Sequence, residues 1–236
     1  DTISRMYDLF SRYYSNTSPE KFRRDLDSKD RVILQMRPDG TLAGFSTVCL
    51  FSVHVNGRLV RVLFSGDTII DRDARQSSGL AGAFGHLTLR IGRQASEPLY
   101  WLLISKGYRT YRFLPVFYHE FYPVYDKPTP DAYSHLLNVI CTARFASAWN
   151  ASTGIIDFGP LHERLTPSQC GVDPHRLSDP HVRFFLQKNP RYAQGTELAC
   201  ITPLNESNLN RYGRRVIAST KVICCLLYTS PSPRDS

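Results

Sequence analysis

The sequence lacks any long hydrophobic run. No apolar stretch in its 236 residues approaches the roughly 18 that a membrane-spanning helix needs, so a membrane span is excluded. The chain also starts without Met or a basic-then-apolar leader, which gives no secretion signal and leads us to expect a fragment. Hydrophobic residues make up 42% and charged residues 21%, a balance typical of a globular chain with one large or two small domains.

Metal-binding cysteine patterns are absent as well. The six cysteines include no C-x-x-C pair, and none has a histidine at metal-ligand spacing, so no metal site is predicted. Cys49 and Cys200 fall within apolar runs, where a free cysteine packs as a small hydrophobic side chain. Unpaired cysteines are most simply explained by a reduced, cytoplasmic location.

Basic clusters are scarce despite a net charge of +8. Twenty-three of the 29 bases are arginine, but they are scattered and gather only in short pairs such as Arg23-Arg24 and Arg214-Arg215. A nucleic-acid partner is therefore disfavoured, because phosphate backbones are bound by clustered bases. The scattered bases indicate a solvated surface or a site for a phosphate-bearing small molecule.

The composition changes abruptly near the C-terminus. The Ser/Pro-rich string over residues 225–236 resembles a translated sequencing adapter and is predicted to be a non-native tail. A natural disordered tail is the alternative, and neither would contribute to a core.

Hydrophobic periodicity predicts an α/β fold with a mixed, mostly antiparallel central sheet flanked by helices and a C-terminal extension. Asn56-Gly57 predicts a tight hairpin, because both residues tolerate positive φ. The aromatic-rich segment 111–122 is expected to be helical. The expected helices cover residues 3–14, 19–29, 79–94, 131–146, 180–187 and 205–216, and the expected strands cover residues 31–37, 42–55, 59–70, 98–105 and 196–202.

The turn from the strand over 59–70 into the helix over 79–94 is the most informative place for function. Small residues there allow a phosphate to approach the unpaired N–H groups that open a helix. Ordinary helix capping is the alternative interpretation. The residues of this turn are Gln76, Ser77, Ser78, Gly79, Leu80 and Ala81.

The pattern Gln76-x-x-Gly79-x-Ala81 resembles the Q/R-x-x-G-x-G/A signature of the GNAT superfamily of acyl-CoA-dependent N-acyltransferases. The order of elements over residues 3–122 is similar to that family too. The resemblance implies that residues 76–81 hold the pyrophosphate of coenzyme A. It also implies that Thr68, Ile69 and Ile70 contact its pantetheine arm, with an N–H near Ile69 stabilising the oxyanion. Acetyl-CoA or another acyl-CoA would be the co-substrate.

Catalysis in such a protein needs a base for the acceptor amine and an acid for the departing thiolate. Asp67 is the candidate base on an otherwise apolar strand; the alternative is a turn or bulge carboxylate bonded to nearby amides. Tyr118 and Glu120 lie in a polar-aromatic cluster where the family often places its acid, and packing is the alternative role. His54 is interpreted as an exposed hairpin residue.

The functional expectation is thus an acyltransferase acting on a small-molecule or peptide amine. The alternatives are a non-catalytic GNAT-fold protein that binds a ligand or partner, and a basic nucleic-acid-associated module. Residues 1–124 are predicted to form the acyl-CoA-binding core, and residues 125–224 to continue the same domain.

Overall fold

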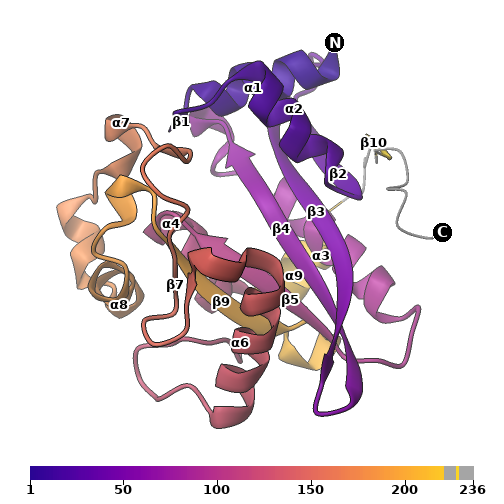
Figure 1. The fold of residues 1–236 in the computed structure, drawn as a ribbon. Helices are drawn as coiled ribbons and strands as arrows, with labels where there is room; N and C mark the ends of the chain where they lie inside the picture. Colours follow the sequence, from indigo (N-terminus) through magenta and orange to yellow (C-terminus); the bar gives the residue numbers. More distant parts are fainter. Residues whose placement is uncertain (221–226, 229–236) are drawn as a thin grey trace.

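The computed structural model describes residues 1–220 and 227–228 and shows an α/β architecture around one large mixed sheet (Figure 1). The α-helices are α1 (Thr2–Ser11), α2 (Pro19–Asp27), α3 (Gly79–Gly92), α4 (Tyr108–Tyr111), α5 (Phe113–Phe117), α6 (Asp131–Phe145), α7 (Pro167–Cys170), α8 (Pro180–Lys188) and α9 (Arg211–Ser219). The strands are β1 (Tyr14–Ser15), β2 (Arg31–Met36), β3 (Leu42–Val55), β4 (Arg58–Ile70), β5 (Leu99–Ser105), β6 (Trp149–Asn150), β7 (Ile155–Ile156), β8 (Arg164–Leu165), β9 (Glu197–Pro203) and β10 (Leu227–Tyr228). The short 3₁₀ segments are η1 (Arg72–Ala74), η2 (Ala146–Ala148), η3 (Pro174–Ser178), η4 (Tyr192–Gln194) and η5 (Glu206–Asn208).

The sheet order is β10-β2-β3-β4-β5-β9-β7-β6, and β1 pairs separately with β8. Among the described strands, β4 and β5 form the one parallel pair of this sheet and the other pairs are antiparallel, so the expected mostly antiparallel sheet is confirmed. The hairpin at Asn56-Gly57 is confirmed as well, since both residues have positive φ. β5 lies between β4 and β9, and its nearly continuous apolar composition suits a strand with a neighbour on each edge.

Helices cover both faces of the sheet. α1 and α2 lie at one end of the long β3–β4 hairpin, α6 lies in front of the sheet, and α3 and α9 lie behind it (Figure 1). The apolar stripes of α1 and α2 place Phe10 and Phe22 against Phe45 and Ile69 in one core cluster. On the other face, Leu87 and Ile91 of α3 belong to the main core.

Two expected helices have different limits. The predicted helix over 111–122 is wrong beyond Phe117, because the chain becomes extended and Tyr118 and Tyr122 form isolated bridges with Leu209 and Ile201. The predicted helix over 205–216 is divided into η5 and α9, since Asn210 caps α9 by accepting a hydrogen bond from the Gly213 N–H.

Residues from the C-terminal part return to the sheet. β9 pairs with β5 from Tyr100↔Pro203 to Ser105↔Leu198, and β7 pairs with β9. The predicted non-native tail lies outside the described residues except for β10, whose two residues pair with β2. The described part of the chain contains no helix long and apolar enough to cross a membrane.

Candidate functional site

The strands β4 and β5 separate partway along their length. Their parallel pairing runs from Arg61↔Leu99 to Ser65↔Leu103 and ends there. β5 then continues along β9, while β4 continues along β3 to Ile70. This divergence leaves one edge of β4 without a neighbouring strand over its last residues, 66–70.

A bulge in β4 marks the start of the divergence. Ser46 pairs with Thr68 but Val48 pairs with Ser65, so Gly66 and Asp67 together oppose the single residue Thr47. A Cβ on Gly66 would lie 2.7 Å from both the Lys29 Cε and the Thr47 Oγ1, so a side chain there would force neighbours to move. The bulge therefore sets the direction in which Asp67 leaves the strand.

The open edge of β4 presents specific backbone groups. The Asp71 N–H donates to the Ala43 carbonyl at 2.8 Å, and alternate residues of a strand point to the same side. The backbone N–H and C=O groups of Ile69 therefore face β3, whereas those of Thr68 and Ile70 face the open edge. The Ile69 N–H, near which an oxyanion donor was expected, therefore points away from the opening, and the N–H groups that point toward it are those of Thr68 and Ile70.

Three cavities meet at this opening, and Thr68 of β4 and Thr110 of α4 line all three. The first, the arginine cavity, has a volume of about 240 Å³ and lies between the end of β4 and the start of α4. The second, the apolar slot, is a narrow space of about 50 Å³ against α3 and α5. The third, the charged cavity, has a volume of about 430 Å³ and lies on the face covered by α1, α2 and α6.

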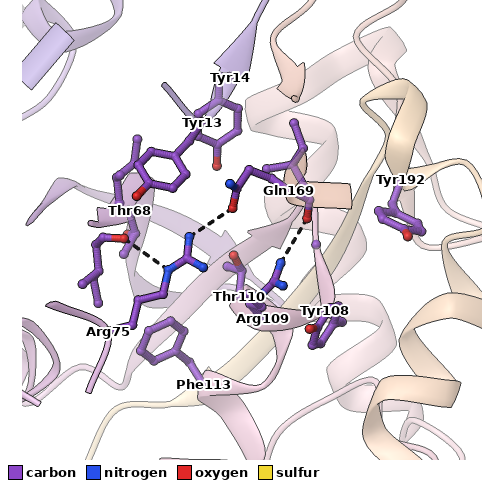
Figure 2. A pocket seen from close by; sticks show the side chains of 14 residues that line it. Tyr13, Tyr14, Thr68, Arg75, Tyr108, Arg109, Thr110, Phe113, Gln169 and Tyr192 are labelled. Atoms are coloured by element: carbon purple, nitrogen blue, oxygen red, sulfur yellow. Dashed lines mark hydrogen bonds between the residues drawn. The ribbon is translucent and has the colours of Figure 1, made fainter. Parts of the chain in front are cut away.

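The arginine cavity is basic and aromatic (Figure 2). Arg75 donates to the Ile70 carbonyl at 3.4 Å and to Gln169 at 3.1 Å, and Arg109 donates to the Gln169 carbonyl at 3.0 Å. Arg75 also lies over the Tyr13 ring. Among the described residues that line this cavity none is acidic, so an anionic group is the favoured occupant.

The turn over residues 71–81 is held by Asp71. Its carboxylate accepts hydrogen bonds from the Tyr13 hydroxyl at 2.8 Å and from Arg37 at 3.1 Å. Although burial opposes it, these hydrogen bonds lower the pKa of Asp71. η1 follows directly, so the expected immediate passage from strand to helix is interrupted by one short 3₁₀ turn.

At the start of α3, Gly79 N–H donates to Ser77 Oγ at 3.2 Å and Gly82 N–H donates to the Ser78 carbonyl. Within the part of the chain that the structure describes, no acceptor faces the N–H groups of Leu80 and Ala81. Leu80 and Ala81 also line the apolar slot, whereas Gln76 and Ser77 are exposed. The α3 N-terminus therefore presents free donors beside the opening.

Asp67 lines the charged cavity. Within the described ranges no group donates a hydrogen bond to its carboxylate. The alternative role, a bulge carboxylate bonded to nearby amides, is therefore met in the bulge but not in the amide hydrogen bonds. Desolvation and the nearby charge of Asp25 raise the pKa of Asp67 to about 7, against the opposing effect of Lys106 and Lys29. Such a carboxyl group can exchange a proton near neutral pH.

The structure separates the two candidate acids. Tyr118 is buried, packs against Trp101 with 5.9 Å between ring centroids, and lines the apolar slot. Burial raises its pKa, so the hydroxyl keeps its proton. Glu120 lines none of the three cavities; its carboxylate accepts from the Tyr122 hydroxyl at 3.4 Å and its backbone bonds to Asn208.

Several site residues were not singled out from the sequence. No local pattern in the sequence marks Arg75, Arg109 or Arg144 as residues of one site. His54 is exposed, as expected, and Cys49, Cys141, Cys170 and Cys200 are free thiols. In the described residues no cluster of His, Cys, Asp and Glu could hold a metal ion.

A scan against protein-family models finds no model that matches this chain, and a search of curated proteins finds no matching relative. The geometry of the junction between the three cavities is therefore the basis for assigning a function.

Proposed function

We propose that this protein transfers an acyl group from acyl-CoA to an amine, directly, within a ternary complex at the opening between β4 and β5. The observation that supports the proposal best is the meeting of three cavities at Thr68 and Thr110, beside the open edge of β4. Two substrates can enter such a junction from different cavities and meet there. The resemblance to GNAT acyltransferases implies that the pantetheine arm of coenzyme A lies along the same edge of β4, at residues 68–70.

Coenzyme A would occupy the side of the opening that carries positive charge. Its phosphates suit Arg75, Arg109 and the free N–H groups of Leu80 and Ala81 at the start of α3. Its pantetheine arm contains amides, which can pair with the exposed backbone groups of the β4 edge as an added strand would. The acyl thioester would then reach Thr68 and Thr110.

The amine would enter through the charged cavity and lose a proton to Asp67. Its nitrogen attacks the thioester carbonyl carbon, and an N–H of Thr68 or Ile70 stabilises the oxyanion that forms. As the C–N bond forms the C–S bond breaks, and the thiolate takes its proton from solvent, because the raised pKa of Tyr118 disfavours that hydroxyl as the acid. The products are an amide and coenzyme A, with the amine's surplus proton passed to solvent.

Release of free thiol from acetyl-CoA in the presence of a panel of amines tests the proposal. Asp67→Asn should lower kcat by at least about 100-fold while leaving acetyl-CoA affinity unchanged, because it removes only the base. Asp8→Asn changes an exposed carboxyl group on α1 and serves as the matched control. Thiol release by Asp67→Asn at the wild-type rate would exclude Asp67 as base, and acetyl-CoA binding without turnover on any amine would support the non-catalytic alternative.

A further inference from the structure

The charged cavity contains almost balanced charges. Three of its basic side chains have an acidic partner: Lys29 with Asp25 at 2.6 Å, Lys21 with Glu163 at 2.9 Å, and Lys106 with Glu197 at 3.3 Å. His162 lies between Glu163 and Glu197, at 3.1 and 3.7 Å.

Two charged side chains of this cavity have no ion-pair partner among residues 1–220: Asp67 on β4 and Arg144 in the last turn of α6. The Arg144 guanidinium is centred 4.9 Å from the Phe64 ring and 5.3 Å from the Phe51 ring. Among residues 1–220, no carboxylate accepts a hydrogen bond from its N–H groups. One anion and one cation therefore line the same space unpaired. A ligand that carries both charges would complement them.

The remaining wall of the cavity is aromatic. Phe64 and Phe145 meet edge to face at 5.8 Å, and Phe145 meets Phe158 at 5.7 Å. Phe10 of α1, Tyr14 of β1 and Phe22 of α2 line another side of the cavity. A ligand with an apolar side chain would bury that side chain here and exclude water from the ion pairs.

We infer that the acceptor amine is a free α-amino acid with an apolar or aromatic side chain, bound with its amino group at Asp67 and its carboxylate on Arg144. The inference rests on the proposed function and specifies its second substrate. Arg144 is a positioning residue, because it holds the carboxylate and does not touch the reacting nitrogen. The overall reaction joins the amino nitrogen to the acyl carbon, breaks the C–S bond, and releases coenzyme A and one proton.

Binding measurements without acyl-CoA separate this inference from the proposed reaction. Isothermal titration at pH 8 would compare phenylalanine with phenethylamine, which lacks the carboxylate, and with 3-phenylpropionate, which lacks the amine. Wild-type protein should bind phenylalanine at least about tenfold more tightly than either analogue, because each analogue leaves one charged group unpaired.

Variants assign each charge to its partner. Arg144→Gln should lower the affinity for phenylalanine and for phenylpropionate by at least about tenfold and leave the affinity for phenethylamine unchanged. Asp67→Asn should lower the affinity for phenylalanine and for phenethylamine and leave the affinity for phenylpropionate unchanged. Arg144→Lys should recover part of the affinity, and Arg90→Gln, an exposed arginine in the last turn of α3, should change nothing.

Equal binding of phenylalanine and phenethylamine, loss of both ligands in Arg144→Gln, or no amino-acid binding by folded wild-type protein would overturn the inference. If phenylalanine binds as described but acetyl-CoA does not bind, the acyltransfer proposal fails and the amino-acid site stands. If acetyl-CoA binds and phenethylamine is acylated as efficiently as phenylalanine, the amino-acid inference fails and the transferase proposal stands.

Discussion

At the scale of single residues, Asp67 is a carboxyl group that folding disfavours in its charged form. Burial desolvates the carboxylate and Asp25 and Glu163 add like charge around it, while Lys106 and Lys29 only partly compensate, so the pKa of Asp67 rises to about 7. In a protein selected for stability alone an uncharged side chain would fit this position better. A carboxyl group with a pKa near neutrality does suit a proton acceptor in a cavity.

Replacing Asp67 by Asn should therefore stabilise the protein above pH 7. Because the folded-state pKa is raised above that of an unfolded Asp, the stabilisation from the protonated form is complete below about pH 4 and is lost as pH rises through about 7. Chemical denaturation should show Asp67→Asn more stable by about 1 to 4 kcal/mol at pH 8 and nearly equal to wild type at pH 4. Asp8→Asn should show no such pH-dependent difference, and a less stable Asp67→Asn at pH 8 would contradict this account.

The sequence identified Asp67 as a candidate but could not show its surroundings. The local pattern predicts a carboxylate on an apolar strand, with a bulge as the alternative setting, and the bulge is present. Arg144, Glu163 and Glu197 lie far along the chain from Asp67, and tertiary packing brings them to the cavity that Asp67 lines. No local periodicity carries that information.

At the scale of elements, strong local signals predicted the limits of β3, α3, β5 and α8 within a few residues. The two-residue strands β6, β7 and β8 were not predicted, because pairs that short have no periodicity and depend on their partners. The same holds for the extended segment after Phe117, where bridges to Leu209 and Ile201 override the aromatic composition.

The packing of α9 on α5 depends on a glycine. A Cβ at Gly213 would lie 2.7 Å from the Phe117 carbonyl oxygen, a backbone atom that cannot move aside. Gly213→Ala should lower the free energy of unfolding by about 1 to 3 kcal/mol, although the helix propensity of alanine exceeds that of glycine by about 1 kcal/mol. Gly92→Ala at the end of α3, whose Cβ would make an ordinary 3.5 Å contact, should be neutral or slightly stabilising. Equal stability of both variants by denaturant titration would argue against the close contact.

At the scale of the whole molecule, one sheet joins the predicted core to the C-terminal part. β9 completes β5 on the side away from β4, and α6 brings Arg144 over the opening, so both parts of the chain build the charged cavity. The α/β class and the mostly antiparallel sheet were predictable from the order of elements. The return of β9 beside β5 was not, because pairing between distant strands leaves no local mark.

The most direct test of the central claim is isothermal titration of acetyl-CoA into wild-type protein and two Gly79 variants. A Cβ at Gly79 meets nothing closer than 3.4 Å, so Gly79→Glu should fold, and an acidic residue in the first turn of α3 suits the helix dipole. Its charge should oppose the pyrophosphate, whereas Gly79→Gln tests bulk alone. We expect saturable binding of acetyl-CoA to wild type, at least about tenfold weaker binding to Gly79→Glu than to Gly79→Gln, and an unchanged or higher Tm for both variants. Absence of acetyl-CoA binding to folded wild-type protein would contradict the proposed coenzyme A site. Equal affinity of Gly79→Glu and Gly79→Gln for acetyl-CoA would contradict it too.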